Sequence, residues 1–233
     1  MRPNLLCTAL ILLSFAGINR ADGPKEASAI KPSSNYEKEI AAFEAKDKKS
    51  PPAPGGIVFV GDSAIRMWTT LETDFPEQKG VLNRGFGGSQ SIDALYYADR
   101  IVIPYKPRLI VFKEGGNDLT AGKTPEQILA NFQGFVEKVR AALPDVRIAY
   151  QGINPNPARW SQKDQRQKAN ALIKAYVASG KNLDFIEIWD VFLDANGKPR
   201  PELFIKDQLH NNAAGYKIMA EAVRPHLSEK SSN

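Results

Sequence analysis

Short apolar segments alternate with longer segments of helical periodicity from the middle of this chain to its end. Residues 57–60 form a fully apolar, mostly β-branched run, which is typical of a strand covered on both faces. Further strands are predicted over residues 81–84, 109–112, 146–150 and 183–189. Apolar residues recur at helical spacing after Ser63, so a helix is predicted directly behind the first strand.

Further helices are predicted before the first strand and after the later ones. They cover residues 35–48, 91–100, 124–143, 162–179 and 213–227. Thr124 followed by Pro125 marks one start, because threonine caps helices and proline fits their first turn. This alternation predicts an α/β fold, a three-layer α/β/α sandwich around a mostly parallel five-stranded sheet with right-handed crossovers.

The N-terminal residues differ from the rest of the chain. Residues 1–21 combine a positive start with an apolar segment from Leu5 to Gly17, which predicts a cleaved secretory signal peptide rather than a membrane span. Residues 22–34 are rich in Pro, Ser, Lys and Ala and predict a flexible leader, so residues 35–228 form the single expected domain. We expect export to a periplasm or beyond.

Charge and cysteine content narrow the possible functions. The net charge of +5 becomes +3 without the two arginines of the signal peptide, and no long basic run is present, so no nucleic-acid partner is expected. The single cysteine, Cys7, leaves with the signal, which excludes disulfides and a thiol nucleophile from the mature chain. No His/Cys/Asp/Glu cluster has metal-ligand spacing, so neither a metal nor another cofactor is predicted.

Polar residues that could take part in catalysis or binding follow several predicted strands. Ser63, Gly88 and Asn117 come after the first three strands, and the carboxyl ends of parallel strands share one edge of a sheet. Taken alone, Ser63 is more simply the N-cap of its helix, with Asp62 bracing the turn. Asn117 is in the same way explained as a turn residue.

A nucleophilic serine needs a base, and the base needs an orienting group. Of the two histidines, His226 lies near the end of the last helix, where a cation is an ordinary feature. His210 precedes that helix and has Asp207 three residues earlier, although both are also common loop residues. Backbone N–H groups of Ser63 and Gly88 and the Asn117 amide are candidate donors to an oxyanion.

Four short blocks together resemble the SGNH hydrolase (GDSL esterase/lipase) superfamily. They are Gly61-Asp62-Ser63, Gly88, Gly116-Asn117-Asp118 and Asp207-x-x-His210, in the family's order, and the resemblance spans residues 57–225. It implies a flavodoxin-like fold with Ser63 as nucleophile, His210 as general base and acid, and Asp207 as its orienting residue. It also implies an oxyanion hole made by Ser63, Gly88 and Asn117.

Two departures from the family's pattern are visible. Ala64 replaces the bulkier residue of the GDSL name, and the charged pair Lys113-Glu114 stands where many relatives carry apolar residues. Because of the second departure, the resemblance does not predict the shape of the pocket beside Lys113 and Glu114.

The resemblance implies a serine esterase, and the predicted signal peptide implies that it is exported. The expected substrate is a short-chain acyl ester, with acetyl the expected acyl group, on a small molecule or a carbohydrate. The Asn/Pro/Trp loop at residues 154–160 suits a cleft for a sugar. Two alternatives stay open: a lysophospholipase or thioesterase of the same fold, and a non-catalytic carbohydrate-binding protein. No stable membrane insertion is expected.

Overall fold

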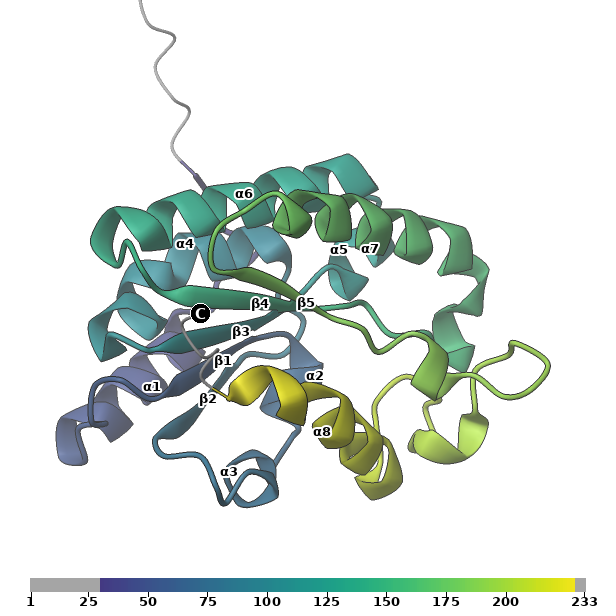
Figure 1. Ribbon diagram of the computed structural model, residues 1–233, viewed down its shortest axis with the longest axis horizontal. Coiled ribbons are helices and arrows are strands. Elements are labelled where there is room, and N and C mark those ends of the chain that lie inside the picture. Colours follow the sequence, from purple (N-terminus) through teal and green to yellow (C-terminus); the bar gives the residue numbers. More distant parts are fainter. Residues whose placement is uncertain (1–29, 229–233) are drawn as a thin grey trace, which may run out of the picture.

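A computed structural model describes residues 30–228 and contains one parallel sheet (Figure 1). Its strands lie in the order β2-β1-β3-β4-β5, and every neighbouring pair is parallel. The strands are β1 (Ile57–Gly61), β2 (Val81–Gly85), β3 (Leu109–Lys113), β4 (Arg147–Gln151) and β5 (Leu183–Ile186). The predicted α/β fold is therefore confirmed.

Helices cover both faces of this sheet, since successive side chains of a strand point to opposite sides (Figure 1). Val58 and Val60 of β1 pack toward α1 (Glu37–Lys49), α4 (Ser91–Ile101), α6 (Pro125–Ala142) and α7 (Lys163–Ala178). Ile57 and Phe59 pack toward α2 (Ser63–Arg66), α3 (Leu71–Asp74) and α8 (Ala213–Leu227). Because all four β1 side chains are fully buried, this strand lies between two hydrophobic cores.

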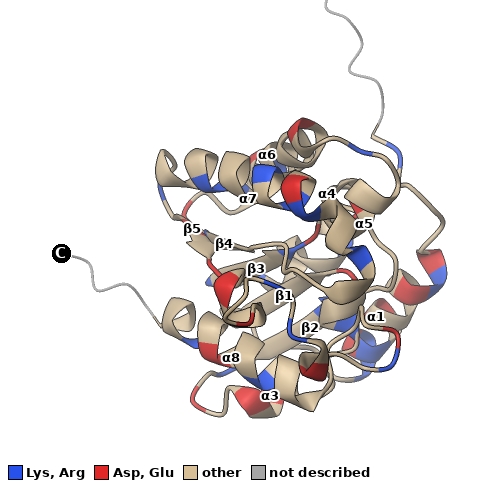
Figure 2. Ribbon diagram, turned by 90° about the vertical axis from the view of Figure 1, so that its right-hand side faces the viewer, with Lys and Arg blue, Asp and Glu red and all other residues tan. Residues whose placement is uncertain are grey.

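Short helical segments complete the loops. They are α5 (Gly116–Thr120) and the 3-10 turns η1 (Ile103–Tyr105), η2 (Pro157–Gln162), η3 (Asp190–Phe192) and η4 (Pro201–Leu203). Basic and acidic residues are interspersed along the elements that face the viewer in Figure 2. None of the described helices is long and apolar enough to cross a membrane.

Two predicted elements are shorter than expected. The helix after Ser63 breaks into α2 and α3, because the Asn83 side-chain amide binds the carbonyl oxygen of Ile65 at 2.7 Å and that of Trp68 at 3.4 Å. The last strand stops at Ile186 rather than residue 189. Ile188 is buried against the core on the α8 side, so the apolar pattern there reflects loop packing.

The predicted signal peptide at residues 1–21 lies outside the described residues, as does most of the predicted leader at 22–34. In the described part of that leader, Ser33 donates hydrogen bonds from its N–H and its hydroxyl to the Asp93 carboxylate, at 2.5 and 2.7 Å. These contacts join the start of the described chain to the first turn of α4.

Candidate active site

Ser63 lies at the sharp turn between β1 and α2, on the edge of the sheet formed by the carboxyl ends of the strands. The N-cap of α2 is Asp62, whose carboxylate accepts a hydrogen bond from the Ala64 N–H at 2.8 Å. The alternative that Ser63 is the N-cap is therefore wrong, and Asp62 braces the turn as expected. A Cβ atom at Gly61 would lie 2.1 Å from the Lys113 carbonyl oxygen, so only glycine fits immediately before the turn.

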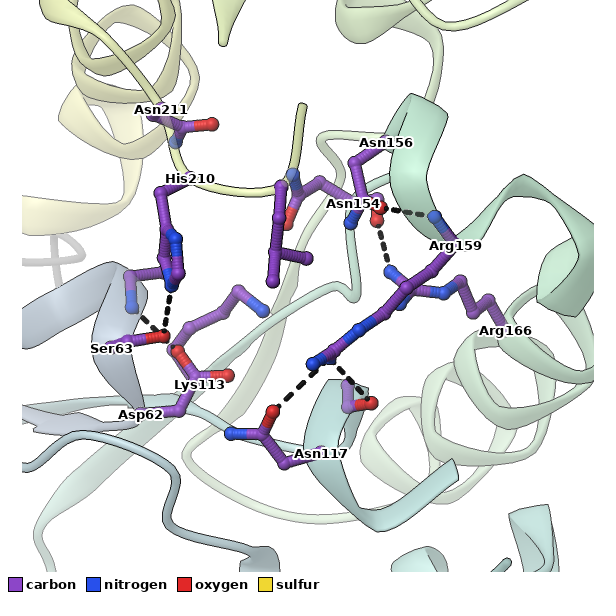
Figure 3. A pocket seen from close by; sticks show the side chains of 13 residues that line it. Asp62, Ser63, Lys113, Asn117, Asn154, Asn156, Arg159, Arg166, His210 and Asn211 are labelled. Atoms are coloured by element: carbon purple, nitrogen blue, oxygen red, sulfur yellow. Dashed lines mark hydrogen bonds between the residues drawn. The ribbon is translucent and has the colours of Figure 1, made fainter. Parts of the chain in front are cut away.

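A hydrogen-bonded chain runs from Ser63 to the loop before α8. His210 Nε2 lies 2.9 Å from the Ser63 hydroxyl oxygen, and His210 Nδ1 lies 2.7 Å from Asp207 Oδ2 (Figure 3). The second Asp207 oxygen accepts the N–H groups of Leu209 and His210 at 2.9 and 3.0 Å. Slight burial acts to raise the pKa of Asp207, but these hydrogen bonds outweigh it and lower the pKa to about 2.

This arrangement determines which histidine nitrogen carries the proton at neutral pH. An ionised carboxylate only accepts hydrogen bonds, so Nδ1 of His210 donates to Asp207. Nε2 then has its lone pair directed at the Ser63 hydroxyl, which is the geometry needed for proton abstraction. The other histidine, His226, pairs with Asp184 at 2.8 Å instead.

The candidate oxyanion donors come from the segments that follow β1, β2 and β3. Asn117 lies in α5, where its amide nitrogen donates to the Ser89 carbonyl at 3.0 Å. The Asn117 amide oxygen accepts a hydrogen bond from Arg159 Nη1 at 3.1 Å. Gly88 follows β2, is itself exposed, and has a φ of +84°, a left-handed conformation that favours glycine. The contacts of Asn117 with Ser89 and Arg159 fix the orientation of its amide.

Ser63, His210 and Asn117 line one small pocket of about 40 Å³, whereas Gly88 is outside its lining. Such a volume holds roughly three water molecules. The remaining lining residues are Asp62, Ala64, Lys113, Gly116, Asn154, Asn156, Arg159, Arg166, Leu209 and Asn211. Most of the pocket wall is therefore polar.

Sequence reasoning missed two of these residues, Arg159 and Arg166. Arg166 is buried on α7, where it shares the inward face with Asn170, Ile173 and Val177. A charged residue at an apolar position of a helical repeat was the available signal. Arg159 follows two prolines in an irregular loop, where periodicity gives no such signal.

The charged pair Lys113-Glu114 is fully buried at the end of β3 and in the next residue. Burial raises the pKa of Glu114 well above its usual range. The Ser89 hydroxyl lies 2.6 Å from the Glu114 carboxyl and 2.9 Å from the Phe86 carbonyl oxygen. A serine has one hydroxyl proton, so both contacts are satisfied when Glu114 is protonated and donates to Ser89.

Comparisons with solved structures agree with the observed architecture. A GDSL-like lipase from Bacteroides thetaiotaomicron is 22% identical, with a TM-score of 0.68 over 81% of this chain and 96% of the other. A carbohydrate esterase family 3 protein from Talaromyces cellulolyticus is 18% identical, with a TM-score of 0.61 over 74% and 96%. A mutant of an acetyl-xylooligosaccharide esterase from Geobacillus Stearmophilus is 16% identical, with a TM-score of 0.62 over 76% and 96%.

Sequence comparison identifies the family. None of the curated proteins compared with this chain matches it significantly. The sequence profile of the GDSL-like lipase/acylhydrolase family matches residues 57–218, which include Ser63, Asn117 and His210. The chain therefore belongs to this family, within the SGNH hydrolase superfamily, and is a carboxylic ester hydrolase.

Proposed function

We propose that this protein is an exported serine esterase that removes a short acyl group, an acetyl group first, through a covalent acyl-enzyme. The observation that carries the proposal is the chain of contacts from Ser63 to His210 and Asp207, at 2.9 and 2.7 Å. In this order the imidazole can take the proton of the hydroxyl, which activates the hydroxyl as a nucleophile, and the carboxylate orients the imidazole and stabilises its charged form.

In this mechanism the Ser63 hydroxyl oxygen attacks the ester carbonyl carbon and its proton passes to Nε2 of His210. Backbone N–H groups of Ser63 and Gly88 and the free N–H of the Asn117 amide stabilise the developing oxyanion. The carbon–oxygen bond to the alcohol then breaks, and the alcohol takes the proton from His210. Water repeats the sequence on the acyl-enzyme and releases the acid, while Asp207 stabilises the imidazolium in both steps.

Three observations support a short acyl group on a carbohydrate. The pocket beside Ser63 is only about 40 Å³ and its lining is largely polar, so it offers no room for a long alkyl chain. Similar folds include a carbohydrate esterase and an acetyl-xylooligosaccharide esterase. Outside the pocket, Trp160 is partly exposed and stacks on Trp189, an aromatic pair of the kind that binds sugar rings.

The first experiment compares hydrolysis of p-nitrophenyl acetate by the mature protein and by its Ser63→Ala variant. We expect the variant to lose about 10⁴-fold or more in kcat, as removal of a catalytic serine does in such triads. Thr69→Ala, at an exposed position beyond α2, is the control for a lost hydroxyl. Equal rates in Ser63→Ala and the wild type would reject the esterase mechanism and favour a carbohydrate-binding protein.

A series of p-nitrophenyl esters from acetate to octanoate tests the acyl-chain length. We expect kcat/KM to fall steeply along the series because the pocket is small. A rising series would favour the lysophospholipase or thioesterase alternative.

Export is a separate part of the proposal, and it depends on the sequence of residues 1–21. The full chain, expressed in a bacterium, is expected to lose these residues and to be found outside the cytoplasm. N-terminal sequencing of the fractionated protein checks this, and an intact Met1–Ala21 segment on cytoplasmic protein would contradict it.

A further inference from the structure

The pocket contains a buried lysine that makes no hydrogen bond within the described part of the chain. Lys113 is the last residue of β3, and only 2% of it is exposed. Among residues 30–228, its ammonium group takes part in no hydrogen bond or ion pair. Figure 3 shows the side chain pointing into the cavity between Ser63 and Arg159. A buried ammonium without a partner is costly, and burial accordingly lowers the pKa of Lys113, so an anion bound beside Nζ would stabilise the charged form of this side chain.

Two arginines line the same cavity. Arg166 is 2% exposed, and its Nη1 donates to the Asn154 carbonyl at 2.8 Å, but its buried Nε has no hydrogen-bond partner in the described part of the chain. Arg159 donates to the Gly116 carbonyl oxygen at 3.2 Å and to the Asn117 amide oxygen at 3.1 Å. All of these acceptors are neutral.

The positive charge of the pocket exceeds its negative charge. Asp62 is the single carboxylate in the lining. Its negative charge acts to raise the pKa of Lys113, Arg159 and Arg166, but one carboxylate faces three basic side chains. Burial lowers the pKa of Lys113, and it lowers that of Arg166 to about 10, with repulsion from Arg159 acting in the same direction. An anion in the cavity removes this repulsion and gives Lys113 the partner it lacks.

We propose that this pocket binds a carboxylate of the substrate, so that the enzyme selects esters carrying a negative charge close to the scissile bond. The inference rests on the proposed serine esterase function. A carboxylate has three heavy atoms, which fits a cavity of about 40 Å³, and its oxygens accept hydrogen bonds from ammonium and guanidinium groups. The carboxylate belongs either to the acyl group, as in a dicarboxylic half-ester, or to the alcohol, as in an acetylated hydroxy acid or uronic acid.

Two matched pairs of substrates distinguish these sources. Monoethyl succinate and ethyl succinamate differ only by a carboxylate or an amide on the acyl side. The pair 3-acetoxypropionate and 3-acetoxypropionamide makes the same comparison on the alcohol side. Hydrolysis is followed by acid release at constant pH and ionic strength, and the quantity compared is the ratio of kcat/KM, charged over neutral.

In the wild-type protein we expect this ratio to exceed about 10 for one of the two pairs, because the free energy of one hydrogen bond to a charged group corresponds to a change of about that size. Lys113→Met is expected to lower the ratio by about 10-fold or more. Lys38→Met removes an exposed lysine on α1 and is expected to preserve it. A wild-type ratio near one for both pairs, or a ratio that Lys113→Met leaves unchanged, overturns the inference.

A measurement on the wild type keeps the inference testable if Lys113→Met does not fold. Succinate is expected to inhibit p-nitrophenyl acetate hydrolysis competitively at constant ionic strength, whereas succinamide at equal concentration is not. Equal inhibition by the two overturns the inference. If Ser63→Ala hydrolyses all four esters as fast as the wild type, the esterase proposal itself has failed.

Discussion

Asp207→Asn is expected to abolish most of the activity while leaving the fold intact. Asp207 Oδ1 accepts two backbone N–H groups, at 2.9 and 3.0 Å, so an asparagine will place its oxygen there and its NH₂ toward His210. The NH₂ group donates to Nδ1, which moves the imidazole proton to Nε2. Nε2 then donates to Ser63 instead of accepting its proton.

The magnitude follows from that reversed tautomer. Loss of one charged hydrogen bond is worth about 1.5–3 kcal/mol, but a histidine in the wrong tautomer cannot act as the base at all. Comparable replacements lower kcat about 10⁴-fold, which equals about 5.4 kcal/mol of transition-state stabilisation. The lost transition-state stabilisation should therefore be larger than the free energy of the single 2.7 Å hydrogen bond between Asp207 and His210.

The assay is kcat for p-nitrophenyl acetate, with thermal unfolding followed in parallel. Asp194→Asn is a matched control, because Asp194 accepts the N–H groups of Asn196 and Lys198 in an exposed turn and contacts no histidine. We expect the control to keep its activity and both variants to unfold within a few degrees of the wild type. If Asp207→Asn retains more than about a tenth of the wild-type kcat, the assigned orientation of Asp207 and His210 is wrong.

Three further changes test other parts of the structure. Glu114→Gln should flatten the pH dependence of stability: the raised pKa of buried Glu114 means that the wild type loses stability as pH rises above the unfolded value near 4.3, at up to about 1.4 kcal/mol per pH unit. Denaturant unfolding at several pH values checks this, and parallel curves for the two proteins would contradict it. Arg159→Met should lower kcat on a neutral acetate ester by about 10-fold, since Asn117 then loses one of the two contacts that orient its amide; a loss confined to KM would assign Arg159 to binding alone. Gly61→Ala should cost about 3 kcal/mol or more of stability, because its Cβ would overlap the Lys113 carbonyl oxygen, and a wild-type melting temperature would show that the turn can relax.

The sequence predicted the fold well because each layer has its own signal. Four consecutive apolar residues at 57–60 require cover on both faces, and this alone indicates a sheet between two layers of helices. The helix after Ser63 was predicted too long because the amide of Asn83, distant in sequence, competes for the carbonyl groups of that helix. Periodicity cannot register such a long-range contact.

The site was predicted unevenly for a related reason. Ser63, Asn117 and the Asp207–His210 segment belong to short sequence blocks, and the structure brings Ser63, His210 and Asn117 to one pocket. The cations of that pocket come from a strand end, an irregular loop and a helix. Nothing in the sequence of any one of these segments links its basic residue to the other two. Only the tertiary structure shows Lys113, Arg159 and Arg166 together.

In the turn after β1, the residues that stabilise the fold differ from the residue proposed to react. Asp62 caps α2 and Gly61 permits the close approach to β3, so the Ser63 hydroxyl has no part in holding the turn. A single base change that removes this hydroxyl therefore leaves a folded protein with its pocket and charges in place. Descendants that bind esters without cleaving them are accessible in one evolutionary step, and a reversion at the same codon restores the enzyme.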